Sequence, residues 1–264
     1  MGRTLAVITG ASSGLGVVFA RKLAADYDLL LVARRKERLE ALAAELTAEY
    51  GCAADVLAAD LTDEKDLAAV ANRIAAEQSL ALLVNNAGFG ARGVFWESDV
   101  EVQEQMHRLH VAATVRLSHA ALRNLVAKNA GGIVNVASVA AFVRRAGSVS
   151  YGATKSWMVT FTEAIHLELK SIQSAVKVQA LCPGFTYTEF HDTMKMDRKN
   201  IAPGWLWLQP EFVVDASLRA LPKGKWLVIP GWRYKAIVAL VSMLPARLRL
   251  AFEAAGAKRL SGRK

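Results

Sequence analysis

The chain has 264 residues, of which 53% are hydrophobic and 22% are charged, and its formal net charge is +9 at pH 7. This composition is that of a globular protein and excludes a disordered one, and the length suits one large domain or two small ones. The positive charge could attract nucleic acid, a membrane surface or an anionic cofactor. The basic residues form no nucleic-acid-binding arm and have no zinc-finger or helix-turn-helix spacing, so we expect no nucleic-acid partner.

Cysteine usage indicates the compartment. Cys52 and Cys182 are the only cysteines, and they lie far apart without metal-ligand spacing. This argues against a disulfide framework and for a reducing, cytoplasmic environment. The chain runs almost directly from Met1 into an apolar segment, so we expect no leader peptide.

The first motif is a glycine-rich turn between an expected strand and an expected helix. Residues 5–9 form a short apolar run typical of a buried parallel strand, and residues 17–25 have helical spacing. The intervening sequence is Gly10-Ala-Ser-Ser-Gly14-Leu-Gly16. Glycines allow a pyrophosphate to approach the backbone, and the free N–H groups of a helix N-terminus hold the anion. The turn predicts a dinucleotide site; the alternative is an ordinary tight turn.

The end of the second expected strand bears on the choice of cofactor. Residues 29–33 precede Arg34 and Arg35. At this point an acidic side chain would accept the ribose hydroxyl of NAD, whereas arginine accommodates the phosphate of NADP. Ala33 has no carboxylate, and Arg34 offers a planar guanidinium to a phosphate. We therefore predict NADP(H); the alternative is that the arginines only solvate the start of a helix over 37–50.

Strands and helices alternate through the rest of the chain. Further strands are expected at 53–61, 80–84, 133–138, 176–181 and 226–229, with a helix opening at Thr62 and a long helical stretch over 97–129. There is no internal repeat or long linker. The alternation predicts an α/β fold, a doubly wound parallel sheet in a single domain over 1–264.

A tyrosine, a lysine and a serine carry the expected chemistry. Tyr151 and Lys155 lie one helical turn apart, so the ammonium is expected near the phenol. A nearby positive charge should lower the phenol pKa from about 10 toward the working range of an acid/base catalyst. Ser138 ends an expected strand and could hydrogen-bond a substrate oxygen. The alternative is an exposed tyrosine that packs against a lysine.

Together these motifs resemble the short-chain dehydrogenase/reductase family over about residues 4–230. They occur in the family order: Thr9-Gly10-x-x-x-Gly14-x-Gly16, Asp60, Asn85-Asn86-Ala87-Gly88, Ser138, Tyr151-x-x-x-Lys155 and Pro183-Gly184-x-x-x-Thr188. The resemblance implies a seven-stranded Rossmann sheet with helices on both faces. It also implies metal-free hydride transfer between NADP(H) and an alcohol or carbonyl. We further expect a homodimer or homotetramer.

The resemblance also implies residue roles. Tyr151 would be the general acid/base, Lys155 would lower its pKa and hold the nicotinamide ribose, and Ser138 would orient the substrate oxygen. The implied cofactor-binding residues are Gly10, Ser12, Ser13, Gly14, Leu15, Gly16, Arg34, Arg35, Asp60, Leu61, Asn86, Ala87, Gly88, Tyr151, Lys155, Pro183, Gly184, Thr186 and Thr188. Asp60 would contact the adenine, Asn86 and Gly88 the adenosine ribose side, and Thr186 and Thr188 the nicotinamide end and its phosphate.

One position departs from the family pattern. The family usually has an asparagine in the helix before the Ser138 strand, where it anchors a water in a proton relay to the lysine. His110 falls at the matching position here. It could relay protons itself, since its ring nitrogens can donate and accept. The alternative is a neutral structural histidine. No other histidine has metal-ligand spacing, so no metal site is expected.

Two C-terminal segments are expected to close the site. A lid is predicted at about 186–212, where Met194, Met196, Trp205 and Trp207 could cover a substrate. The alternative is a surface loop with two aromatic anchors. An apolar, basic extension is predicted over about 231–264. Its unbroken apolar run is too short to span a bilayer. It could pack on the lid or a partner subunit, the interpretation we favour, or lie on a membrane surface.

The sequence thus predicts an NADPH-dependent carbonyl reductase, or an alcohol dehydrogenase in reverse, for a fairly apolar small-molecule substrate. Two alternatives stay open at this point. The apolar tail allows a membrane-surface reductase of acyl or steroid-like ketones. His110 allows a dinucleotide-binding sensor or scaffold with little turnover.

Overall fold

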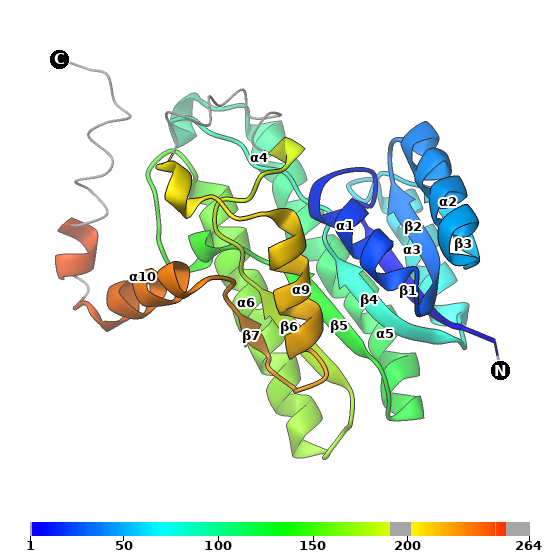
Figure 1. Cartoon of the computed structure of the whole chain (residues 1–264). Helices are drawn as coiled ribbons and strands as arrows, with labels where there is room; N and C mark the ends of the chain where they lie inside the picture. The colour runs from blue at the N-terminus through cyan, green and yellow to red at the C-terminus, as the bar shows by residue number, and fades with distance from the viewer. Residues whose placement is uncertain (1, 191–201, 246, 252–264) are drawn as a thin grey trace.

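A computed structural model describes residues 2–190, 202–245 and 247–251 of the chain. Seven parallel strands form one sheet in the order β3-β2-β1-β4-β5-β6-β7 (Figure 1). In that spatial order the strands are Ala54–Ala58, Tyr27–Ala33, Thr4–Thr9, Leu80–Asn85, Gly132–Val136, Lys177–Leu181 and Leu227–Val228. The predicted seven-stranded parallel sheet is therefore confirmed.

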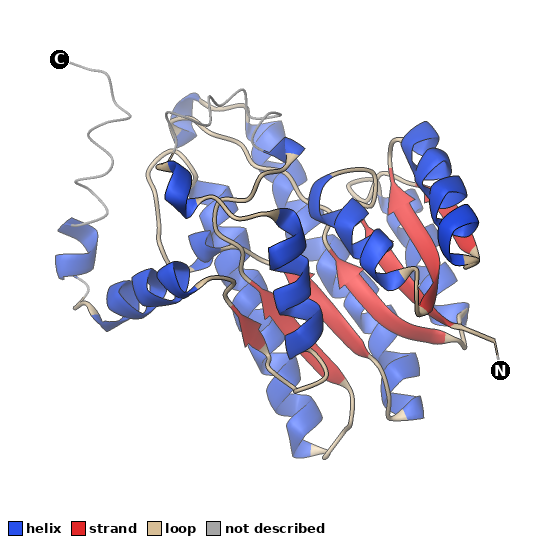
Figure 2. Ribbon diagram, in the orientation of Figure 1, coloured by secondary structure: helices blue, strands red, loops and turns tan. Residues whose placement is uncertain are grey.

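Helices cover both faces of this sheet, as Figure 2 shows. Strand side chains alternate between the faces, so that Ala6 and Ile8 belong to one buried cluster and Leu5 and Val7 to the other. The helices that pack into the first cluster are α1 (Gly14–Leu23), α2 (Lys36–Tyr50) and α9 (Pro210–Ala220). Those that pack into the second are α3 (Glu64–Ala76), α5 (Ala113–Lys128) and α6 (Val149–Ser171). This arrangement is the doubly wound Rossmann fold in a single domain.

The strand order reverses between β1 and β4. From β1 the chain moves outward through β2 to β3, then returns to place β4 on the other side of β1. The loops that leave the carboxyl ends of β1 and β4 therefore diverge, and in open α/β sheets ligands bind in the crevice that this creates. The fold thus locates the site at the loops that follow these two strands.

Several predicted boundaries were wrong. The third strand ends at Ala58, not at residue 61, because Asp60 turns back to accept hydrogen bonds from the backbone and hydroxyl of Thr62 at 2.9 and 2.7 Å. The next helix is capped by Asp63, whose side chain accepts from the N–H of Asp66 at 2.9 Å, and not by Thr62.

The long helical stretch expected over 97–129 is continuous only from Val100. Asp99 caps α4 (Val100–His107) by accepting from the N–H of Glu101 at 3.0 Å. A π-helical turn over Arg108–Ala112 joins α4 to α5. Such a turn widens the helix locally and is frequent at functional sites. This one carries His110.

The predicted lid lies only in part within the structure. Met194 and Met196 fall outside the described residues. Before that gap, residue Thr186 forms an isolated parallel bridge with Leu208. Trp207 is buried and stacks on Tyr187, whereas Trp205 is 57% exposed. Only one of the two tryptophans is therefore an anchor, and the lid ends where α9 begins.

The C-terminal helix α10 (Trp232–Met243) packs on the lid through Tyr234. The Tyr234 hydroxyl donates to the carbonyl of Leu206 at 2.6 Å and accepts from the N–H of Phe185 at 2.9 Å. Its ring lies against Gly184, where an added Cβ would come within 1.9 Å of the ring. Within the described part of the chain, no helix combines the length and apolarity needed to cross a membrane.

Candidate active site

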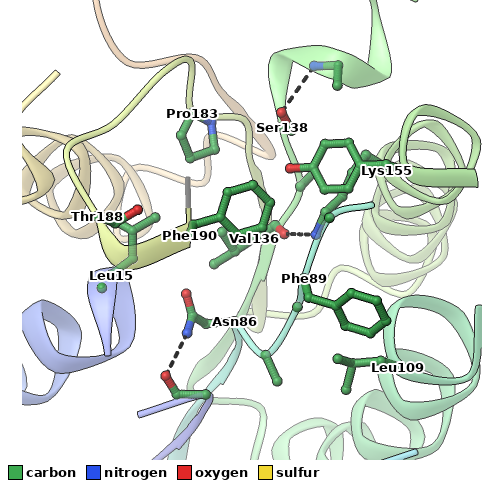
Figure 3. Close-up of a pocket in the computed structure, with 18 of the residues that line it drawn as sticks. Leu15, Asn86, Phe89, Leu109, Val136, Ser138, Lys155, Pro183, Thr188 and Phe190 are labelled. Carbon is green, nitrogen blue, oxygen red and sulfur yellow. Dashed lines mark hydrogen bonds between the residues drawn. The ribbon is translucent and has the colours of Figure 1, made fainter. Parts of the chain in front are cut away.

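A pocket of about 1100 Å³ opens at the carboxyl ends of the strands. It is lined by the glycine-rich turn, the loops after β2, β3, β4 and β5, the start of α6 and the lid. Every residue predicted for the site lines this pocket except Gly16 and His110. Figure 3 shows the inner part of the pocket, with Leu15 and Thr188 on one side and Ser138 and Lys155 on the other.

The glycine-rich turn is shaped by backbone conformation and close packing. Gly10 and Gly14 have φ of +66° and +57°, which favour glycine. An added Cβ at Gly10 would lie 2.9 Å from Cα of Ala87, and one at Gly16 only 2.2 Å from the carbonyl oxygen of Gly10. Gly16 therefore holds α1 against the turn and does not line the pocket. Ser13 precedes α1 without capping it, and the first turn has no acidic residue, so the N-terminal N–H groups can receive an anion.

Asn86 fastens the loop after β4 to the glycine-rich turn. Its side-chain amide donates to the carbonyls of Thr9 at 2.9 Å and Gly10 at 3.3 Å. The hydroxyl of Thr9 in turn accepts from the N–H groups of Asn86 at 2.9 Å and Ala87 at 3.0 Å. Both walls of the crevice are therefore held at a fixed separation, which is a positioning role that the sequence did not reveal.

Two arginines border the pocket after β2. Arg34 lies 3.6 Å from Asp60 and its side chain is 75% exposed. Arg35 donates to the hydroxyl and carbonyl of Ser12 at 3.1 and 3.2 Å, and lies 3.3 Å from Glu189 of the lid. Burial acts to raise the pKa of Asp60, but hydrogen bonds from Thr62 and the charge of Arg34 together lower it. This end of the pocket thus offers guanidinium groups beside the glycine-rich turn, the arrangement that a phosphate requires.

Ser138, Tyr151 and Lys155 meet at the end of β5. Burial raises the pKa of Tyr151 to about 12, although a hydrogen bond with Ser138 acts in the opposite direction. Burial also lowers the pKa of Lys155 to about 8. The Lys155 ammonium donates to the carbonyl of Val136 at 2.8 Å (Figure 3) and lies 5.8 Å from the centre of the Tyr151 ring. The expected lowering of the phenol pKa was therefore wrong for this structure, because burial dominates.

His110 lies behind the pocket and is fully buried. Its Nε2 accepts from the N–H of Phe89 at 3.3 Å, so Nδ1 carries the hydrogen and donates to the hydroxyl of Thr154 at 2.9 Å. The hydroxyl of Thr154 in turn donates a hydrogen bond to the backbone carbonyl of Tyr151 at 3.1 Å. Burial, and then the charge of Lys155, lower the pKa of His110 well below its usual value, which keeps the ring neutral.

The lid end of the pocket is aromatic. Phe190 lies 5.8 Å from the Tyr151 ring, centre to centre, and Figure 3 shows it in the middle of the pocket between Thr188 and Lys155. Thr188 packs over the glycine-rich turn, where an added Cβ at Gly14 would lie 3.3 Å from it. Thr186 is buried and donates to the carbonyl of Gly184 at 3.0 Å.

Several lining residues were missed from the sequence. Arg92, Arg144 and Arg145 line the pocket, as do the apolar side chains of Phe89, Leu109 and Val143. An Arg-Arg pair between Ser138 and Tyr151 was a usable signal, since it lies in the loop that joins two expected catalytic residues. The aromatic and apolar residues had no such signal, because they resemble ordinary core residues.

Comparison with known proteins agrees with this geometry. The family profile described as short chain dehydrogenase matches residues 4–199. The chain belongs to the short-chain dehydrogenase family. The predicted family resemblance is thereby confirmed.

Among curated relatives of this short-chain dehydrogenase is the NADP-dependent 3-hydroxy acid dehydrogenase of Schizosaccharomyces pombe. It is 32% identical, over 86% of this chain and 90% of the relative. Among solved structures, a short-chain dehydrogenase from Sphingobium yanoikuyae in complex with NADPH is 35% identical, with a TM-score of 0.82 over 92% of this chain and 97% of that one. The bulky-bulky ketone specific alcohol dehydrogenase from Comamonas testosteroni is 32% identical, with a TM-score of 0.78 over 93% and 96%.

Proposed function

We propose that this short-chain dehydrogenase uses NADP(H) to interconvert an alcohol and a carbonyl group, with Tyr151 as the general acid/base. The observation that carries the proposal is the meeting of Ser138, Tyr151 and Lys155 at one end of a pocket whose other end is a glycine-rich turn. The relatives named for NADPH or NADP support the choice of cofactor.

The residues present fit a phosphorylated dinucleotide. The positive φ at Gly10 and Gly14 exposes backbone to the pocket, and the uncapped start of α1 offers N–H donors to a pyrophosphate. Arg34 and Arg35 would hold the additional phosphate that distinguishes NADP from NAD. When bound, NADPH supplies the hydride.

The proton comes from the chain's own residues. The Tyr151 phenol is protonated at neutral pH, so it holds the proton that a carbonyl oxygen would accept. Burial raises its pKa to about 12 and so makes it a weaker donor, and the positive charge of Lys155 would act against that effect. Ser138, hydrogen-bonded to Tyr151, would hold the same oxygen in place. Lys155, anchored on the carbonyl of Val136, would place its remaining N–H donors toward the cofactor ribose. His110, held by Phe89 and Thr154, would support the packing of α6 behind the pocket.

The test follows NADPH absorbance with a panel of ketones and aldehydes. We expect carbonyl-dependent oxidation of NADPH by the native chain and its near-complete loss in Tyr151→Phe, which lacks only the hydroxyl. The melting temperature and NADPH affinity of the variant should remain close to native, since the ring is retained. Substantial activity in Tyr151→Phe would mean that another group is the acid. Tight NADPH binding without turnover on any carbonyl would instead favour the sensor role.

We also propose a homodimer or homotetramer in the cytoplasm. Val100 on α4 and Val115 on α5 are 66% and 41% exposed, which is consistent with a subunit contact. The two cysteines are free and buried, as suits a reducing compartment. Sedimentation velocity tests the oligomer, and a monomer at micromolar concentration would contradict it.

A membrane-surface reductase is the second candidate, because α10 exposes apolar side chains. Trp232, Leu240 and Met243 are strongly exposed on that helix. Co-sedimentation with anionic liposomes tests this, with Trp232→Ala as the variant that should weaken binding. Absence of the native chain from the liposome pellet would leave the first candidate alone.

A further inference from the structure

We propose that the substrate of this enzyme carries a carboxylate, which Arg92 and Arg145 bind at the end of the pocket remote from Arg34. The inference rests on the proposed function, because it concerns the substrate of that same site. It adds an anionic group to the fairly apolar substrate that the sequence predicts.

The two arginines come from loops at the carboxyl ends of β4 and β5. Arg92 lies in the loop after β4, and Arg145 lies in the loop between Ser138 and Tyr151, which follows β5. Arg34 follows β2, which β1 and β4 separate from β5 in the sheet. At about 4.8 Å between neighbouring strands, the ends of β2 and β5 are roughly 14 Å apart. Arg92 and Arg145 therefore follow β4 and β5, the side of the sheet from which Ser138 comes, whereas Arg34 follows β2.

A backbone hydrogen bond joins the two loops that carry the arginines. The N–H of Gly93 donates to the carbonyl of Gly147 at 3.1 Å. The two glycines have φ of +140° and +78°, conformations that other residues rarely adopt. The N–H of Ser148 closes a turn by donating to the carbonyl of Arg145 at 3.3 Å. This backbone arrangement holds the two arginine-bearing segments next to each other.

The two pairs of arginines differ in their ion-pair partners. At the cofactor end, Arg34 has Asp60 as a partner and Arg35 has Glu189. In the parts of the chain that the structure describes, neither Arg92 nor Arg145 lies within ion-pair distance of a carboxylate. Both side chains are solvent-exposed. Desolvation, and then the charge of Arg145, lower the pKa of Arg92, so the two guanidinium groups are close enough to repel each other. A carboxylate between them would remove this repulsion and accept hydrogen bonds from both.

The pocket also has apolar and aromatic lining residues. Phe89, Leu109 and Val143 line the same pocket as the two arginines, and Phe190 lies 5.8 Å from the Tyr151 ring, centre to centre. An apolar chain would fit these side chains, while its far end reaches the arginines. The ligand class that satisfies both is an oxo acid, reduced to the corresponding hydroxy acid.

The experiment compares medium-chain oxo acids with their methyl esters, which differ in charge and keep the carbonyl and the chain. With NADPH and the native enzyme, we expect kcat/KM to be at least about tenfold higher for the acid, the factor that one charge-assisted hydrogen bond supplies. The preference for the acid should appear as a lower KM with little change in kcat, and it should weaken with added salt. In the double variant Arg92→Gln/Arg145→Gln, the acid-to-ester ratio should fall to within about twofold of one. Arg145→Lys should retain part of the preference, because it keeps the charge and loses the planar fork.

Arg219→Gln is the matched control, since Arg219 is an exposed arginine on α9 that does not line the pocket. It should leave the ratio unchanged, and melting temperatures verify that all variants are folded. Equal kcat/KM for acid and ester in the native enzyme would overturn this inference while the proposed function stands. An acid preference that survives in the double variant would also overturn it. Failure of every carbonyl compound to oxidise NADPH would overturn the proposed function, and this inference with it.

Discussion

Replacement of His110 tests whether this residue relays protons or supports the structure. His110→Ala removes a fully buried ring and leaves the N–H of Phe89 without its acceptor. Large-to-small substitutions in a core cost about 2–5 kcal/mol, and an unsatisfied donor costs about 1–3 kcal/mol. Since some relaxation is expected, we predict a loss of about 4 kcal/mol and a melting temperature roughly 10 °C lower. The turnover number per folded molecule should be retained, because both ring nitrogens already have partners within the protein.

The assay measures melting temperature and turnover number on the same preparations of His110→Ala and His110→Asn. Asparagine, the usual family residue, should give an intermediate melting temperature and full turnover. His119→Ala is the control, since His119 is exposed on α5 and should change neither quantity. An alanine variant with a native melting temperature and a tenfold lower turnover number would refute the structural role and support the relay.

The same residue gives the native chain a pH dependence. The pKa of His110 is lowered in the folded state, whereas in the unfolded chain it is 6.5. As the pH falls below about 6.5, the unfolded chain takes up a proton that the folded chain does not. The free energy of unfolding should therefore fall with decreasing pH, by up to about 1.4 kcal/mol per unit from this group. His110→Ala should lose this component, which denaturant titrations between pH 7 and pH 5 would detect.

Three further substitutions test other parts of the site. Arg34→Ala should weaken NADPH binding by about 1–2 kcal/mol and leave NADH binding nearly unchanged. The expected loss is at the low end for a charged hydrogen bond because the Arg34 side chain is exposed. Arg21→Ala is the control, since Arg21 pairs with Glu45 outside the pocket, and equal losses for both cofactors would contradict the assignment of Arg34. Lys155→Met should reduce both turnover and NADPH affinity, measured by steady-state kinetics and fluorescence titration, and an effect on only one would remove half of its proposed role. Tyr234→Phe should lower the free energy of unfolding by about 1–3 kcal/mol, because two backbone groups lose their partner, and an unchanged denaturation midpoint would contradict that contact.

The fold was predictable because it depends on patterns that are local in the sequence. The alternation of apolar strands with amphipathic helices gave the parallel sheet, and the glycine-rich turn marked where the first strand ends. The position of the pocket followed from the same pattern, since parallel strands present their carboxyl ends on one side. Arg34, Asp60 and Ser138 lie at strand ends, which is why their place in the pocket could be predicted from the chain alone.

Other features depend on contacts that no local pattern records. The direction of the Tyr151 pKa shift depends on how much of the phenol is buried, and spacing to Lys155 could not reveal it. The amide of Asn86 joins two loops that are far apart in the sequence. The pairing of the Arg92 and Arg145 loops depends on the hydrogen bond between Gly93 and Gly147, for which the sequence has no signal.

The opposite pKa shifts of Tyr151 and Lys155 have one cause. Burial disfavours the charged form of each group, so it raises the pKa of the Tyr151 phenol to about 12 and lowers the pKa of the Lys155 ammonium to about 8. At neutral pH the phenol is therefore protonated and Lys155 is mostly charged. Reduction of a carbonyl uses the protonated phenol and oxidation of an alcohol uses the phenolate, so the same pair serves both directions. Lys155, 5.8 Å from the centre of the Tyr151 ring, supplies positive charge that favours the phenolate, which is why its replacement is expected to lower turnover.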